Sequence, residues 1–169
     1  HAQIIALPIV PFEIRSRTEE ARRYFDDTAR CVFCHMLSDE LKVGTRVIAE
    51  SEHFVAFVLY AAFSPFHTWI VPRRHEPSFL RATAHEMADL GDLLHRVLRK
   101  LYVGLRDPDY NYAIRTAPLR DPGYDYLHWY ITLFPRITHT AGFEMGSGMF
   151  INSAMPENSA AFLRSVSAE

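Results

Sequence analysis

Cys31 and Cys34 stand two residues apart in the stretch CVFCHM, and the chain has no other cysteines. Thiols at this spacing form redox pairs, disulfides or half of a metal site. A redox pair is expected between a strand and a helix of a βαβ unit, whereas this pair follows a predicted helix and precedes polar loop residues. A metal site is therefore the better interpretation, and zinc would need about two further ligands, commonly histidines.

The chain offers nine histidines as further ligands. His75 lies in PRRHEPSF, just past the end of a predicted strand, and His128 lies inside another predicted strand, in YLHWYITLFP. His35 competes because it directly follows the second cysteine, and a core histidine bonded to a backbone carbonyl is the alternative for His128. His85 and His95 are expected on the exposed face of a long helix. Spacing alone leaves the ligand set open.

Composition restricts the class of protein. A length of 169 residues favours one domain with its own core. Eighteen basic against twenty acidic side chains give a net charge of -2, which argues against a nucleic-acid binder. No apolar run approaches the roughly 20 residues that cross a bilayer, and no signal-peptide pattern is present. We therefore expect a cytoplasmic protein without a membrane or nucleic-acid partner.

The elements that position these residues are several strands and one long helix. Thr83 and Glu86 form a capping box, and leucines at intervals of three and four residues then predict an amphipathic helix of about six turns. Ser16 and Glu19 predict a shorter helix through about residue 28, and Pro156 begins a final one. Short connections predict an antiparallel sheet, an α+β fold, with strands at 45–50, 54–60, 67–72, 110–118 and 124–135.

Five motifs occur together along the chain: CVFC, SEHFVAFVLYAAFSPFHTWIVPRRHEPSF, DPDYNYAIRTAPL, LHWYITLFPR and AGFEMGSGMFIN. In this order they resemble the C-terminal half of the galactose-1-phosphate uridylyltransferase family, in the histidine-triad superfamily, near the branch of plant ADP-glucose phosphorylase. The resemblance implies a histidine-triad-like antiparallel sheet with one long helix and shorter flanking helices. It also implies that residues 1–15 end the catalytic strand of a preceding half and that 16–169 form the domain.

The resemblance implies a ligand set for the metal. A Cys-x-x-Cys, His, His zinc site maps onto Cys31, Cys34, His75 and His128. Four protein ligands complete a tetrahedral site, so this zinc would be structural rather than catalytic. Iron is the alternative metal.

The resemblance also implies where transfer chemistry lies. The family carries His-x-His-x-Gln, and the initial HAQ resembles its end, so His1 would be the nucleophile and Gln3 would donate to the phosphoryl oxygens. A neutral imidazole can hold a nucleotidyl group as a labile phosphoramidate. The corresponding motif of this half is His128-Trp129-Tyr130, with a phenol where the catalytic histidine would stand. A phenol with a pKa near 10 is a poor leaving group for this exchange, so this half resembles a pseudo-site.

The glycine-rich stretch AGFEMGSG covers residues 141 to 148. Its glycines permit tight turns and close backbone approach, and a simple bend before the last helix is one interpretation. The resemblance instead implies a loop that reaches the active site. In that loop Phe143 and Glu144 would contact the hexose phosphate, and Gly142 and Gly146 would shape the backbone.

Together these features predict the C-terminal part of a hexose-1-phosphate nucleotidylyltransferase, most simply one that exchanges UDP-glucose with galactose-1-phosphate. Its expected partners are the N-terminal half of the same polypeptide and possible second copies in a homodimer. Without that half, we expect the chain to be inactive. An ADP-glucose phosphorylase-type adenylyltransferase is one alternative, and a non-catalytic zinc-stabilised binding module is another.

Overall fold

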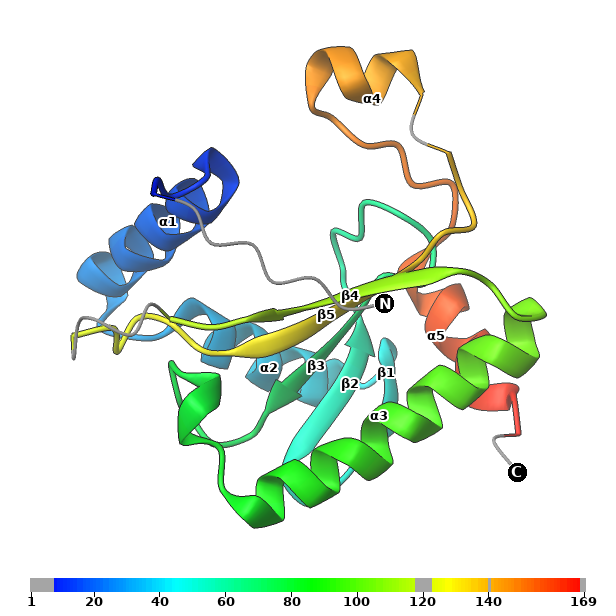
Figure 1. Ribbon diagram of the computed structural model, residues 1–169, viewed down its shortest axis with the longest axis horizontal. Coiled ribbons are helices and arrows are strands. Elements are labelled where there is room, and N and C mark those ends of the chain that lie inside the picture. Colours follow the sequence, from blue (N-terminus) through cyan, green and yellow to red (C-terminus); the bar gives the residue numbers. More distant parts are fainter. Residues whose placement is uncertain (1–7, 118–122, 140, 168–169) are drawn as a thin grey trace.

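A computed structural model describes residues 8–117, 123–139 and 141–167. Its centre is a five-stranded antiparallel sheet in the order β1-β2-β3-β5-β4 (Figure 1). The antiparallel α+β fold expected from the sequence is thereby confirmed. The strands are β1 (Val47–Glu50), β2 (Phe54–Val58), β3 (Thr68–Pro72), β4 (Tyr110–Arg115) and β5 (Tyr130–Pro135).

Helices cover both faces of the sheet. Phe33 packs against Trp69 of β3 and Tyr130 of β5, which places its helix over one face. Ile70 and Ile131 point to the opposite face and are also buried, and the helices that contact β1 and β2 are α3 and α5. The helices are α1 (Phe12–Thr28), α2 (Val32–Val43), α3 (Ala84–Leu105), α4 (Gly142–Ser147) and α5 (Pro156–Ser165), with a 3₁₀ turn at Phe79–Arg81.

The long helix forms as its sequence pattern predicts. α3 begins after Thr83, whose side chain accepts the Glu86 N–H, and the Glu86 carboxylate accepts the Thr83 N–H. Its buried positions include Leu90, Leu93 and Leu101, which recur along one side of the helix. No helix in the described ranges combines the length and the apolar character needed to cross a bilayer.

Two helix predictions need correction. The first helix begins at Phe12 after Pro11 rather than at Ser16, and its first turn has no side-chain cap. The domain boundary expected between residues 15 and 16 falls within this helix and stays a prediction. The polar loop expected after the cysteines is helix α2, because Phe33 and Leu37 supply a buried stripe that the polar residues around them obscure.

The last strand and the glycine-rich stretch also differ from expectation. β5 begins at Tyr130, so His128 precedes the strand rather than lying inside it. The predicted bend at residues 141 to 148 contains a short helix, α4, which ends at Gly148 with φ of 70°, a left-handed conformation that glycine adopts without strain. In Figure 1, α4 stands on an arm away from the sheet.

Candidate metal centre and the adjoining sheet face

The start of α2 holds the two cysteines. Cys31 is the N-cap residue, with extended backbone, and its carbonyl accepts the His35 N–H at 3.1 Å. Cys34 lies in the first turn, and residues three apart on a helix share a side. Both side chains therefore face the same direction. Gly44 ends the helix in the left-handed conformation, with φ of 71°.

The two histidines are brought together by one backbone contact. His75 follows β3 and His128 precedes β5, and the Trp129 N–H donates to the Glu76 carbonyl at 2.9 Å. This hydrogen bond joins the residues that follow the two histidines. The loop around His75 is held further by Arg74, whose guanidinium donates to Glu86 at 2.8 Å and to Glu76 at 3.1 Å.

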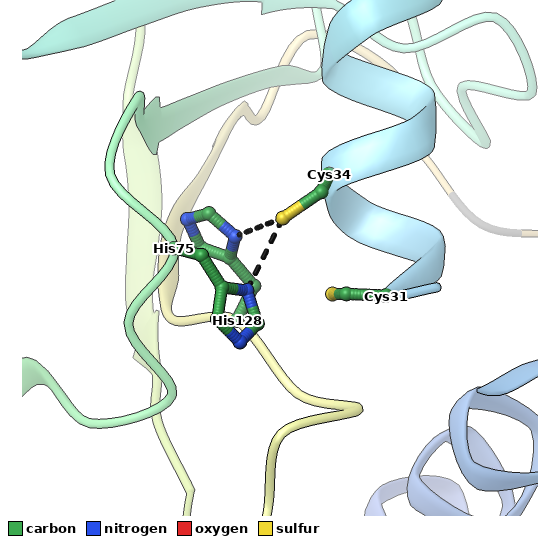
Figure 2. Close-up of side chains that lie close together, drawn as sticks. All are labelled: Cys31, Cys34, His75 and His128. Atoms are coloured by element: carbon green, nitrogen blue, oxygen red, sulfur yellow. Dashed lines mark hydrogen bonds between the residues drawn. The ribbon is translucent and has the colours of Figure 1, made fainter. Parts of the chain in front are cut away.

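Cys31, Cys34, His75 and His128 converge on one point (Figure 2). One potential ligand atom from each lies within 4.8 Å of the others. Sγ of Cys34 is 3.2 Å from Nδ1 of His75 and 3.3 Å from Nδ1 of His128. Around a tetrahedral zinc with Zn–S near 2.3 Å and Zn–N near 2.0 Å, neighbouring ligand atoms stand about 3.3–3.8 Å apart. The four residues fit a Cys2His2 zinc ion.

The electrostatics of the thiols favour a cation. The Cys34 thiol donates to Cys31 and lowers the pKa of Cys31 to about 4, while the hydrogen bond to the Cys31 sulfur, followed by burial, raises the pKa of Cys34. A bound zinc ion would stabilise both thiolates at once, because metal ligation displaces thiol protons.

Exposure places the cluster at the edge of the core. Cys31 and His128 are buried, Cys34 is half-buried and His75 is exposed. A cavity of about 510 Å³ adjoins the cluster on the exposed side, and Arg30 and Lys42 help to line it. Since all four positions of a tetrahedral ion are filled by protein atoms, the arrangement suits a structural metal better than a catalytic one.

The competing histidines lie outside this cluster. The His35 ring hydrogen-bonds the Tyr24 hydroxyl and lies 3.4 Å from a carboxylate oxygen of Asp39. His85 and His95 are exposed on α3, as expected.

The structure does not describe the expected catalytic residues. His1 and Gln3 lie outside the described residues. The predicted substrate residues Gly142, Phe143 and Glu144, with Gly146, lie in α4 and are not part of the metal cluster. Glu144 lines a separate cavity of about 300 Å³ beside the far end of β5, where Phe134 and Arg136 also lie.

The face of the sheet next to the cluster is filled by aromatic rings. Tyr130 is 3% exposed and stacks on Trp69 with ring centroids 4.0 Å apart. Burial raises the pKa of the Tyr130 phenol, which makes a phenolate nucleophile less accessible. A buried phenol with a raised pKa is a poor nucleophile, so this position is not suited to nucleotidyl transfer.

Sequence reasoning missed a buried histidine on the same face. His67 is 4% exposed, and its Nε2 lies 2.7 Å from Oγ1 of Thr132. Its only local signal was a histidine at the start of the apolar run HTWIVP, and its partner is 65 residues away.

Comparison with known proteins gives a consistent family. Residues 17–168 match the model of the galactose-1-phosphate uridyl transferase C-terminal domain. An ADP-glucose phosphorylase of Arabidopsis thaliana is 39% identical over 169 residues, which cover 99% of this chain and 47% of that protein. The galactose-1-phosphate uridylyltransferase of Thermotoga maritima is 28% identical over 178 aligned residues, 100% of this chain and 55% of that protein. The chain thus spans about half the length of these relatives.

Solved structures agree with the fold. A crystal structure of an ADP-glucose phosphorylase from A. thaliana with bound ADP-glucose has a TM-score of 0.85 and 39% identity, covering 95% of this chain and 50% of the other. A zinc-bound histidine triad family protein from Mycobacterium smegmatis has a TM-score of 0.53 at 23% identity, covering 79% and 90%. The second likeness shows the histidine-triad fold alone.

Proposed function

The chain belongs to the galactose-1-phosphate uridylyltransferase family, as its C-terminal domain, and from this premise we propose that it is half of an enzyme that transfers a nucleotidyl group between sugar phosphates. The proposal rests on the similarity to an ADP-glucose phosphorylase. The aligned residues are 39% identical and cover 99% of this chain and 47% of that protein. The N-terminal half of the same polypeptide is then the partner. A cytoplasmic location and a homodimer stay predictions from the sequence.

In the proposed mechanism, His1 attacks the α-phosphorus of a nucleotide sugar and displaces the sugar phosphate. The nucleotidyl group is held on the imidazole nitrogen, and Gln3 donates a hydrogen bond to a non-bridging oxygen as charge builds there. A phosphate oxygen of the acceptor then attacks the same phosphorus and releases the imidazole. Tyr130, buried against Trp69, takes no part in these steps.

Two nucleotide sugars are candidates for the donor. UDP-glucose with galactose-1-phosphate as acceptor is the simplest reading of the family, while ADP-glucose with phosphate is the second candidate. The second is favoured by the higher identity to the Arabidopsis phosphorylase, 39% against 28% for the Thermotoga uridylyltransferase. We further propose that Phe143 and Glu144 contact the sugar phosphate, and that Gly142 and Gly146 shape their loop.

The metal is proposed to be zinc, bound by Cys31, Cys34, His75 and His128. The ion would supply no chemistry to transfer and would hold α2, the loop after β3 and the segment before β5 together. Elemental analysis of the purified protein decides between zinc and iron, and a metal-free preparation that is fully folded would count against the proposal.

The function is tested on a full-length protein that contains this chain. Each donor, labelled at the α-phosphorus, is incubated with and without its acceptor, and the trapped protein adduct and the products are measured. His1→Ala should lower transfer by about 10³-fold or more and remove the adduct. His85→Ala, an exposed histidine on α3, should change neither.

Three outcomes would count against the proposal. If His1→Ala kept both transfer and the protein adduct, His1 would not be the nucleophile. Full activity of the 169-residue chain alone would show that the other half is not needed. Absence of any adduct in the full-length protein would favour a non-catalytic binding module.

A further inference from the structure

Two arginines without acidic partners meet beside Tyr130. Arg115 of β4 is the direct cross-strand neighbour of Tyr130, and Arg17 of α1 lies close enough to Arg115 to lower the pKa of its guanidinium. Neither guanidinium forms an ion pair with any residue that the structure describes. The Nε of Arg115 is buried and makes no hydrogen bond. Two different elements therefore direct positive charge to one place.

A buried histidine extends this group along the same face. Thr132 stands two residues after Tyr130, so its side chain lies on the same face of β5, and it holds Nε2 of His67. Nδ1 of His67 is buried and unpartnered. With the Thr132 hydroxyl donating to Nε2, the proton of the neutral ring stands on Nδ1, which is then a free donor.

Among the residues that the structure describes, no carboxylate forms an ion pair with Arg17, Arg115 or His67. Burial and Arg17 lower the pKa of Arg115, and burial followed by the two arginines lowers the pKa of His67 to about 4. The buried carboxylates Glu40, Glu76 and Glu86 already pair with other arginines, Arg46 and Arg74. An unpaired buried cation is costly, and an oxyanion that accepts from guanidinium N–H groups removes the cost.

We propose that Arg17, Arg115 and His67 form a binding site for a phosphate group on the sheet face that Tyr130 closes to transfer chemistry. Guanidinium forks match the geometry of phosphate oxygens, and the Nδ1–H of His67 supplies a neutral donor. Inorganic phosphate and the phosphate of a sugar phosphate or nucleotide share this chemistry. The site does not depend on His1, and so it stands independently of the proposed function.

The test is calorimetric titration of the 169-residue chain with inorganic phosphate, glucose-1-phosphate and AMP in separate experiments. We expect one phosphate group per chain. Affinity should fall about tenfold or more in Arg115→Gln, since a hydrogen bond to a charged group is lost. Tight binding of phosphate alone would identify the free ion as ligand, whereas tighter binding of glucose-1-phosphate or AMP would identify the esterified group.

Matched variants separate binding from folding. Arg17→Gln, on a partly exposed side of α1, should weaken binding as Arg115→Gln does, while Arg115→Lys should recover part of it. Arg22→Gln removes the same charge from an exposed position of α1 and should bind as the wild type. Wild-type affinity in both Arg17→Gln and Arg115→Gln, or no binding by the wild-type chain at millimolar ligand, would overturn the site.

Discussion

At the scale of single residues, the metal cluster depends on which histidine faces it. His75 and His35 both border the same cavity, but only His75 has a ring nitrogen next to Cys34 Sγ. The substitution His75→Ala should therefore abolish stoichiometric zinc binding, whereas His35→Ala should keep it. Metal content of the purified variants, measured by elemental analysis, checks this. Equal zinc in both variants would remove His75 from the ligand set.

At the same scale, His67 makes the folding stability of the protein depend on pH. Its pKa is lowered from 6.5 to about 4, chiefly by burial, so the unfolded chain takes up the proton first as pH falls. The stability that this neutral ring contributes is fully present above pH 6.5 and is lost as pH falls through 4. The loss amounts to roughly 3 kcal/mol.

Urea unfolding at a series of pH values measures this effect. The amide in His67→Gln can still pair with Thr132. In this variant the decrease of the unfolding free energy between pH 6.5 and 4 that is due to His67 should disappear. The exposed His85→Gln serves as the control and should leave the slope unchanged. A wild-type slope in His67→Gln would contradict the assignment.

At the scale of elements, the N-terminus of α3 stabilises the loop that carries His75. Glu86 caps the helix and also accepts from Arg74, which lowers its pKa to about 2. A depressed carboxyl pKa contributes stability that is present above pH 4.5 and lost as pH falls through 2. Glu86→Gln should lower the free energy of unfolding by about 1–3 kcal/mol at pH 7. It should also remove the decrease of that free energy between pH 4.5 and 2.

Thr83→Ala is the matched change at the same helix end. It removes the hydroxyl cap at a cost of about 0.5–2 kcal/mol but leaves the Glu86–Arg74 pair in place. Its unfolding free energy should therefore keep the wild-type decline below pH 4.5. If both variants lost that decline, the acid dependence would belong to the cap and not to the ion pair.

Local patterns predicted the elements that have a clear period. The capping box and the leucine spacing located α3, and the apolar runs located β1 to β4 to within about three residues, whereas the predicted β5 began six residues too early. α2 was missed because its buried stripe, Phe33 and Leu37, is short and interrupted by His35 and Asp39. Runs of apolar residues also extended β5 back over His128, although pairing begins only at Tyr130.

The functional residues were harder to predict from local sequence patterns than the fold was. Spacing singled out Cys31 and Cys34, but residues 41 and 94 positions beyond Cys34 complete the cluster, and only the family resemblance named them as a set. The grouping of Arg17, Arg115 and His67 depends on strand register and helix placement. No motif in the sequence carries either of these, so this second site could not be predicted.

At the scale of the whole molecule, a metal would act as a cross-link between distant segments. The cluster joins α2 to the loop after β3 and to the segment before β5, whereas the core is centred on the fully buried Phe54, Ile70 and Leu133, none of which is a ligand. Closing long loops reduces the entropy of the open chain, so a bound ion stabilises these segments most. Removing it should leave the sheet and α3 folded.

Chelation should therefore cause local rather than global opening. After metal removal, amide hydrogen exchange should accelerate first in α2, in residues 73–79 and in residues 123–129, while the buried amides of β2 and of the middle of α3 stay protected. Peptide-level exchange with and without chelator measures this. In Cys34→Ser, which lacks one ligand, the same segments should exchange fast already and chelator should add nothing. Uniform acceleration across the sheet would mean that the ion holds the entire core, and no acceleration at all would mean that the four side chains converge without supporting a metal.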